Sequence, residues 1–151
     1  MSYTNESGRR QIIDDSVAAA NYLGEAMAAL GEAYDLLDDP TADRMEATVF
    51  KPVQASVGQL KRTLAEFATR YKLPAPVFET AGLPAPTNPH TTLDRVIELV
   101  QAADDTVADL QDSLLPVEVG DTDLRAGLSR ARTLIGPVPD AADGLIRMLG
   151  R

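Results

Sequence analysis

Acidic side chains are the first candidates for chemistry in this chain, because two pairs of them recur at helical spacing. Glu32 and Asp35 are three residues apart, and so are Asp109 and Asp112. Carboxylates that share one helix face can hold Mg²⁺ beside a phosphate group, as a helical nucleotide pyrophosphatase requires. The same spacing is common on any acidic helix, and no complete paired-acid motif surrounds these residues. We therefore expect solvated surface, and we keep a Mg-dependent nucleotide pyrophosphatase-like enzyme as an alternative.

Histidine and cysteine, which most often bind metals or act as nucleophiles, are nearly absent. The 151-residue chain has no cysteine and one histidine, His90. A di-iron bundle needs two inward-facing Glu-x-x-His pairs, and a thiolate zinc site needs cysteines. There is also no glycine-rich phosphate loop or nucleophile elbow. We expect no catalytic residue, no metal ion and no cofactor, and we favour a non-enzymatic protein.

A seven-residue hydrophobic repeat predicts the helices that carry these acids. Apolar residues recur at alternating spacings of three and four in the segments 8–37, 40–72, 91–115 and 121–149. A repeat near 3.5 residues keeps one face of a helix against a neighbouring helix. The repeat predicts an all-α fold, an antiparallel up-and-down four-helix bundle that forms one domain over residues 1–151.

The repeat also assigns the inner and outer faces of the helices. The inner positions are nearly all apolar, and the polar exceptions are Ser16 and the hydroxyls of Tyr34 and Tyr71. These three would be the inward polar groups of a small-molecule-binding bundle, the second alternative. In an antiparallel hairpin Tyr34 and Tyr71 lie at opposite ends, which argues against a shared pocket.

Six acids fall on the outer positions of the repeat and are the candidate partner-binding residues. They are Glu25, Glu32, Asp35, Asp105, Asp109 and Asp112. Side chains at these positions point to water rather than to the seam between helices. We therefore expect them to form contacts with a partner instead of a buried metal site.

Prolines predict where the helices end or bend. Residues 73–90 contain five prolines and the tetrapeptide LPAP twice, so this segment is a linker without a continuous helix. Extended, it spans ~50 Å and would make the third helix parallel to the second. Alternatively it folds back over one end, with Val77, Phe78 and Leu83 covering the core, and we favour this path. Met45 and Val49 fall out of the hydrophobic register that continues from Phe50, and Pro52 lies beside this change, so we expect a kink or a brief break near 49–52.

Short sequence motifs also predict where the last helix bends and where the third helix begins. Gly136 to Asp140 contains two prolines and should break or bend the last helix, although the hydrophobic count continues to its end. Thr91 with Asp94 fits a capping pattern for the third helix. Gly24 and Gly31 flank the inner face of the first helix, where they permit close packing or leave a small pocket; we favour close packing.

Charge is distributed unevenly among the predicted helices. Residues 11–43 have eight acids and no base, and residues 91–115 have six acids and one base, whereas residues 44–72 have six bases and two acids. Two acidic helices side by side would repel each other. We therefore expect the first and third helices on a diagonal, separated by the others. Lys61, Arg62, Arg70 and Lys72 form a basic cluster that either pairs with the acidic helices or binds an anionic partner.

The net charge of −9 restricts the function. An acidic surface repels phosphate backbones, so we expect no nucleic-acid binding. No segment has the ~20 apolar residues of a membrane span, and no secretory signal is visible, so we expect a cytoplasmic protein. The excess of arginine over lysine is typical of a GC-rich bacterial genome. We expect an interaction or assembly module that binds a protein with a basic surface or associates with itself.

Overall fold

The computed structural model describes residues 2–82, 84–85 and 87–149, with side chains from residue 5 onward. The regular structure of these residues is entirely helical, so the predicted all-α class is confirmed. In chain order the elements are α1 (Ser2–Tyr34), α2 (Asp39–Met45), the π-helical turn η1 (Glu46–Phe50), α3 (Lys51–Arg70), α4 (Pro89–Asp112), α5 (Leu115–Glu118), α6 (Thr122–Ile135) and α7 (Val138–Leu149). Within the described part of the chain, no helix combines the length and the hydropathy of a membrane-crossing segment.

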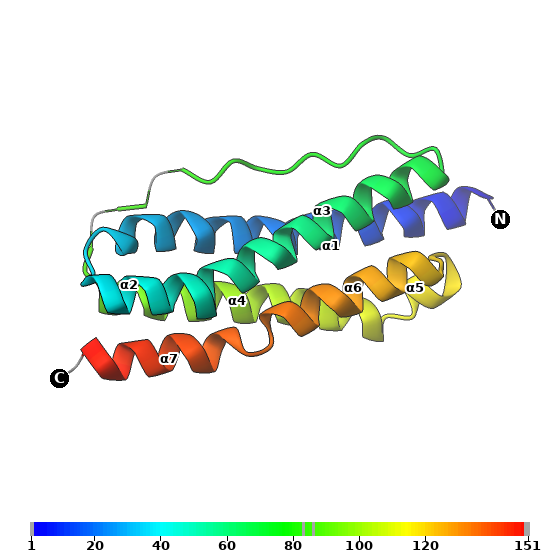
Figure 1. Cartoon of the computed structure of the whole chain (residues 1–151). Helices are drawn as coiled ribbons and strands as arrows, with labels where there is room; N and C mark the ends of the chain where they lie inside the picture. The colour runs from blue at the N-terminus through cyan, green and yellow to red at the C-terminus, as the bar shows by residue number, and fades with distance from the viewer. Residues whose placement is uncertain (1, 83, 86, 150–151) are drawn as a thin grey trace.

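The longer helices form four rods that lie side by side (Figure 1). The first rod is α1, and the second is the run from α2 through η1 to α3. The third rod is α4, and the fourth is the pair α6–α7. α1 packs against both α3 and α4, α6 packs against α3, and α7 packs against α4. Figure 1 shows that α1 and α6–α7 run in one direction and that α3 and α4 run in the other. Each rod is therefore antiparallel to the rods that it contacts. The up-and-down order expected from the sequence is wrong, because the consecutive helices α3 and α4 are parallel and the segment between them runs back along the bundle (Figure 1).

The predicted diagonal placement of the two acidic helices is wrong. α1 and α4 make the most extensive helix contact in the described structure. Five buried alanines of α1 help neighbouring helices to approach closely; they are Ala19, Ala20, Ala26, Ala29 and Ala33. Each buried large apolar side chain contributes about 1.5–3 kcal/mol, whereas a pair of exposed charges contributes about 0–1 kcal/mol. Apolar contact therefore outweighs the repulsion between outward-facing acids.

The segment 73–88, here called the strap, follows the length of α1 (Figure 1). The path over one end, favoured from the sequence, is wrong. The strap has neither helix nor strand at its described residues, and its length matches that of the 33-residue α1, since both are about 50 Å long. Phe78 packs against the core, but Val77 is 83% exposed. Leu83 lies outside the described residues.

The hydrophobic repeat identifies most of the core correctly. The inner positions from Leu93 to Leu110 and from Leu124 to Leu145 are all buried. Tyr34 and Leu114 are exceptions and are 40% and 56% exposed. Leu114 follows the end of α4 and has a φ angle of 70°, so its side chain leaves the helical repeat.

The kink expected near 49–52 is the π-helical turn η1, which ends two residues before Pro52. A proline removes one backbone hydrogen bond and crowds the preceding turn, and a π turn accommodates one extra residue there. The buried residues Met45 and Val49 are consequently out of the register that Val53 and the following core residues keep. The expected break in the last helix separates α6 from α7 at residues 136–137.

Helix N-termini are capped by short polar side chains. Asp38 accepts a hydrogen bond from the Thr41 N–H, and Asp121 accepts one from the Leu124 N–H. At the start of α4 the cap is Asn88 rather than Thr91, because the side chain of Asn88 accepts the Thr91 N–H. With Pro89 in its first turn, the helix starts three residues earlier than the capping pattern predicts.

Candidate interaction surface

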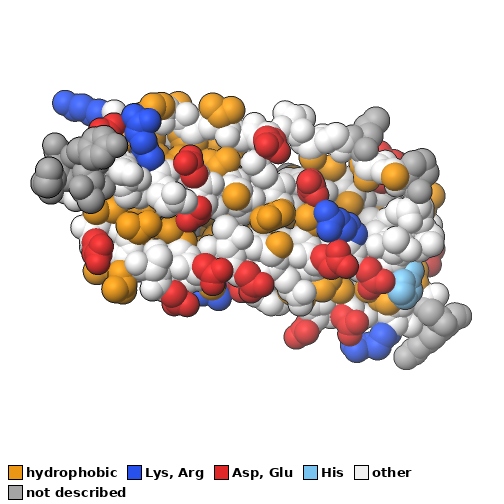
Figure 2. Space-filling model, turned by 180° about the vertical axis from the view of Figure 1, so that it is seen from behind, with side chains coloured by type: hydrophobic (Ala, Val, Ile, Leu, Met, Phe, Trp, Pro, Cys, Tyr) orange, Lys and Arg blue, Asp and Glu red, His pale blue; other side chains and the backbone are white. Residues whose placement is uncertain are grey.

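The six candidate acids are all exposed in the structure. They are Glu25 and Glu32 on α1, Asp35 in the turn after α1, and Asp105, Asp109 and Asp112 on α4. Because α1 and α4 pack side by side, their outer faces form one surface, here called the acidic face. Figure 2 shows this side of the molecule, marked by His90 at the start of α4, with acidic side chains along its length and few basic ones among them.

The structure does not gather these acids into one compact cluster. Asp35 follows the last turn of α1 and Asp112 ends α4, and since the two helices are antiparallel these residues lie at opposite ends (Figure 1). The two candidate Mg²⁺-binding pairs are thus far apart. In the described residues, no three His, Asp or Glu side chains come close enough to hold one metal ion. The acids form an extended charged surface.

Arg95 is the basic residue at the junction of the two acidic helices. Its guanidinium lies 3.4 Å from the Glu25 carboxylate on α1 and 3.2 Å from Glu98 on its own helix. More than half of the side-chain surface of all three residues is exposed, so solvent and salt weaken these ion pairs. Arg95 links α1 to α4 without neutralising the acidic face.

A second arginine neutralises the inner edge of α4. The Nε atom of Arg132 on α6 lies 2.9 Å from the Asp104 carboxylate, and Nη1 donates to Gln111 Oε1 at 2.9 Å. Hydrogen bonding to Asp104 raises the pKa of Arg132, with further contributions from the charges of Asp112 and Asp105. Arg132 therefore pairs directly with Asp104 and interacts at longer range with Asp105 and Asp112, whose carboxylates remain exposed.

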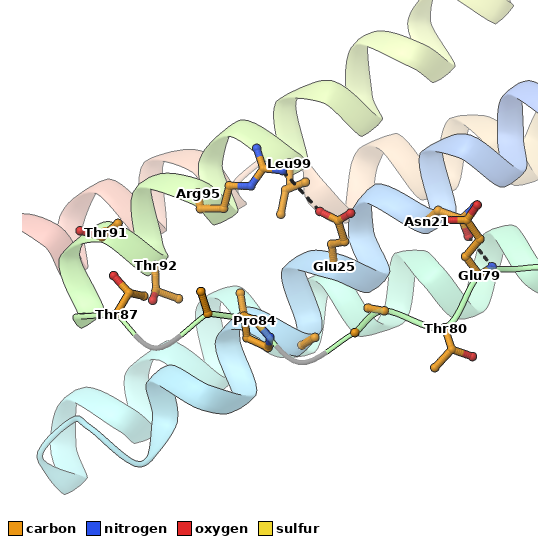
Figure 3. Close-up of a pocket in the computed structure, with 15 residues that line it drawn as sticks. Asn21, Glu25, Glu79, Thr80, Pro84, Thr87, Thr91, Thr92, Arg95 and Leu99 are labelled. Carbon is orange, nitrogen blue, oxygen red and sulfur yellow. Dashed lines mark hydrogen bonds and ion pairs between the residues drawn. The ribbon is translucent and has the colours of Figure 1, made fainter.

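A groove of about 700 Å³ lies between the strap, α1 and the first turns of α4 (Figure 3). Its floor is formed by Ala28 and Ala29 of α1 and by Leu99 and the buried Thr92 of α4. Its walls carry polar groups, including Asn21, Glu25, Glu79, Thr80, Thr87, Thr91 and Arg95. Such a mixture of an apolar floor and scattered polar groups is typical of a small-molecule site.

The strap is fixed to α1 at one edge of this groove. The Glu79 N–H donates to Asn21 Oδ1 at 3.0 Å, and Lys61 on α3 lies 5.2 Å from the ring centre of Phe78. Figure 3 shows the strap passing from Thr80 to Thr87 in front of the two helices. The prolines of this segment are visible in the sequence, but the sequence does not predict that the strap covers a groove.

The expected inward polar groups do not meet in a pocket. Ser16 is completely buried, and its hydroxyl makes no hydrogen bond within the described structure. Tyr34 is the last residue of α1, whereas Tyr71 follows the last residue of α3, and the guanidinium of Arg9 lies 4.0 Å from its ring centre. None of the three lines the groove under the strap.

The predicted basic cluster at the end of α3 divides into separate roles. Arg70 forms two hydrogen bonds with Asp121, at 2.7 and 2.9 Å, so it pairs with the cap of α6 and not with the acidic helices. Hydrogen bonding to Asp121 raises the pKa of Arg70. Lys61, Arg62 and Lys72 form no ion pair within the described residues. The cluster is not a single anion-binding patch.

Gly24 and Gly31 do not mark close helix packing, contrary to the favoured interpretation. A β-carbon added at either position would meet no atom within 4 Å. Gly31 instead lines a small hollow between α1 and the region of α2 and η1. The other interpretation of this glycine, a small pocket, is the one that the structure supports.

Comparison of the chain with protein-family models, with curated proteins and with solved structures finds no match.

Proposed function

We propose that this protein is a non-enzymatic interaction or assembly module, a four-helix bundle whose acidic face binds a partner with a basic surface. The observation that supports the proposal is the contact between α1 and α4. It joins a segment with eight acids and no base (11–43) to a segment with six acids and one base (91–115). In this view the strap, residues 73–88, is a linker whose length allows α4 to lie against α1.

An extended face of one charge accelerates association with an oppositely charged surface and makes binding depend on salt. Carboxylates that are already exposed need little desolvation to take part in such contacts. Binding through this face should therefore weaken as ionic strength rises and should tolerate partners of different shape. These properties fit a protein that recruits or assembles other proteins.

The test uses a fluorescently labelled lysine-rich peptide as a cationic probe. The triple variant Asp105→Asn, Asp109→Asn and Asp112→Asn should weaken binding about tenfold at low salt, because each lost charge removes part of the attraction. A matched triple variant, Glu118→Gln, Asp123→Asn and Asp140→Asn, removes the same charge from α5, α6 and α7 and should bind nearly as well as the natural protein. Equal losses in both triples would contradict a role for the acidic face.

Self-association is the second form of the same function. Light scattering over a range of protein concentrations measures it directly. A mass that rises with concentration at high salt, where the net charge is screened, would assign the module to assembly with its own copies.

The groove under the strap supports one alternative function, the binding of a small molecule. Its volume of about 700 Å³ is suitable for a metabolite. Ala28→Leu places a larger side chain on the groove floor, and Ala18→Leu makes the same change at an exposed position of α1. If a metabolite panel raises the melting temperature of the natural protein and of Ala18→Leu but not of Ala28→Leu, the groove is a ligand site.

The enzymatic alternative has a separate test. A Mg²⁺ titration followed by NMR should leave the signals of Glu32, Asp35, Asp109 and Asp112 unchanged if these acids are only surface groups. Specific shifts at one pair, together with nucleotide hydrolysis, would favour a pyrophosphatase-like activity.

A further inference from the structure

A second, smaller hollow lies at the end of the molecule where α1 meets α2 and η1. Its volume is about 280 Å³, and its lining residues are Leu30, Gly31 and Tyr34 of α1 and Met45, Glu46 and Phe50 of the α2–η1 run. We call it the end groove. It is separate from the groove under the strap, with which it shares no lining residue.

The end groove is apolar inside. Leu30 and Met45 are almost completely buried and form its floor, and Phe50 is half-buried at its side. Gly31 opens the groove, since a β-carbon at this position would meet no atom within 4 Å. Tyr34 is 40% exposed at its rim. The result is a hollow large enough for one bulky apolar side chain.

The π-helical turn contributes to this hollow. Glu46 and Phe50 are the first and last residues of η1, and both line the groove. A π turn inserts one residue into a helix and displaces the side chains that follow it, which is one reason such turns occur often at functional sites. The hollow is therefore built by a local departure from regular helix geometry.

Carboxylates surround the rim of the end groove. The pKa of the Tyr34 hydroxyl is raised, first by partial burial and then by the charges of Asp43, Glu46, Asp39 and Asp35. Glu32 is exposed next to Gly31 in the sequence. The nearby base Arg44 lines a different hollow, against Asp140 and Arg147 of α7. An apolar hollow with an acidic rim is complementary to an apolar side chain flanked by basic ones.

We infer that the end groove is a docking site for a basic amphipathic helix of a partner protein, which inserts one large apolar side chain over Gly31 and places Lys or Arg against the acidic rim. This inference depends on the proposed function, because it supplies the anchor point for a basic partner. Recognition of an amphipathic helix by an apolar groove with complementary charges is an established mode of peptide binding. Glu32 and Asp35 then act at the groove, while the acids of α4 provide long-range attraction.

The experiment compares two leucine substitutions on the same helix. Gly31→Leu fills the end groove, whereas Gly24→Leu, seven residues earlier, adds the same side chain at a position where a β-carbon also meets nothing and that lines neither groove. The probe is a labelled peptide of leucine and lysine with the spacing of an amphipathic helix. In Gly31→Leu the peptide can no longer bury a leucine in the end groove, so its affinity should fall about tenfold or more. The affinity of Gly24→Leu for the peptide should equal that of the natural protein.

A second peptide, in which serine replaces each leucine, separates this inference from the proposed function. Weaker binding of the serine peptide, with no further loss in Gly31→Leu, supports the end groove. If the natural protein and Gly31→Leu bind both peptides equally, the proposal that the acidic face binds a basic partner stands, and the inference that the end groove is a docking site is wrong. Binding of neither peptide would overturn both proposals. If Gly31→Leu instead abolishes self-association while peptide binding is unchanged, the occupant is a second copy of this chain and the inference is wrong. Thermal unfolding of both variants checks that each is folded.

Discussion

Gly127 on α6 lies directly against Thr63 on α3. A β-carbon at position 127 would clash with Thr63 Oγ1, because the two atoms would lie far inside the distance that real side chains show. Two turns away on α3 and one turn away on α6, Ser56 Oγ donates to the Ala131 carbonyl oxygen at 2.9 Å. Small residues therefore bring α3 and α6 into close contact on the side of the molecule away from the acidic face.

Gly127→Ala should lower the free energy of unfolding by about 1–3 kcal/mol, because the added methyl group has no room beside Thr63. The gain in helix propensity, about 1 kcal/mol, offsets only part of this cost. Gly24→Ala is the matched control, since its β-carbon meets nothing and it should stabilise the protein by about 0.4–1 kcal/mol. Urea denaturation measures the free energy of unfolding of both variants. Stabilisation by Gly127→Ala would show that α3 and α6 are less tightly packed.

The two buried serines should respond in opposite directions to alanine. Ser56 loses its hydrogen bond to Ala131, so Ser56→Ala should cost about 1 kcal/mol. The hydroxyl of Ser16 is buried without a partner, so Ser16→Ala removes an unsatisfied group and should raise stability by about 1 kcal/mol. Calorimetry of the two variants decides the matter. A loss of stability in both would mean that the Ser16 hydroxyl is bonded in solution.

The sequence predicted the helices well because their core faces are set by local spacing. Leu93 to Leu110 and Leu124 to Leu145 follow the repeat without exception. The predicted neighbours of the helices were wrong, because apolar contact between α1 and α4 outweighs the repulsion of their charges. The exposed acids of α1 and α4 repel weakly through water, while the buried alanines of α1 favour close packing.

The candidate sites depend on features that one helix cannot reveal. The groove under the strap exists because Glu79 is tied to Asn21 across 58 residues of sequence. The end groove needs the π turn, which the sequence indicated only as a change of register near Pro52. Gly31 shows the difficulty clearly, since a glycine beside a helix seam is compatible with close packing and with a hollow.

Asp121 should make stability depend on pH in the acid range. Burial alone would raise the pKa of Asp121, but hydrogen bonds from Arg70 and from the Leu124 N–H, together with the Arg70 charge, lower it. A carboxyl whose pKa is lower in the folded state stabilises the protein fully above its unfolded value, about 3.9, and loses this effect as the pH falls through the folded value. The free energy of unfolding of the natural protein should therefore decrease below about pH 4.

Two substitutions isolate the contribution of this residue. Asp121→Asn keeps an oxygen for the Leu124 N–H but loses the charge that pairs with Arg70, and should cost about 1 kcal/mol at neutral pH. Asp121→Ala also loses the helix cap and should cost about 1 kcal/mol more. The difference between the natural protein and Asp121→Asn should narrow as the pH falls below about 4. A difference that stays constant with pH would exclude Asp121 as the titrating group.

The contact between α1 and α4 makes a prediction about salt. Both helices carry excess negative charge on the acidic face, and their mutual repulsion opposes folding. Raising NaCl from about 0.02 to about 0.5 M shortens the screening length from roughly 20 to roughly 4 Å and should raise the melting temperature by about 3 °C. Arg95→Gln removes the base that lies between Glu25 and Glu98, so its melting temperature should rise more steeply with salt. Arg130→Gln makes the same charge change at an exposed position of α6 and should keep the slope of the natural protein. If all three proteins respond equally, the repulsion is spread over the whole surface and is not concentrated between α1 and α4.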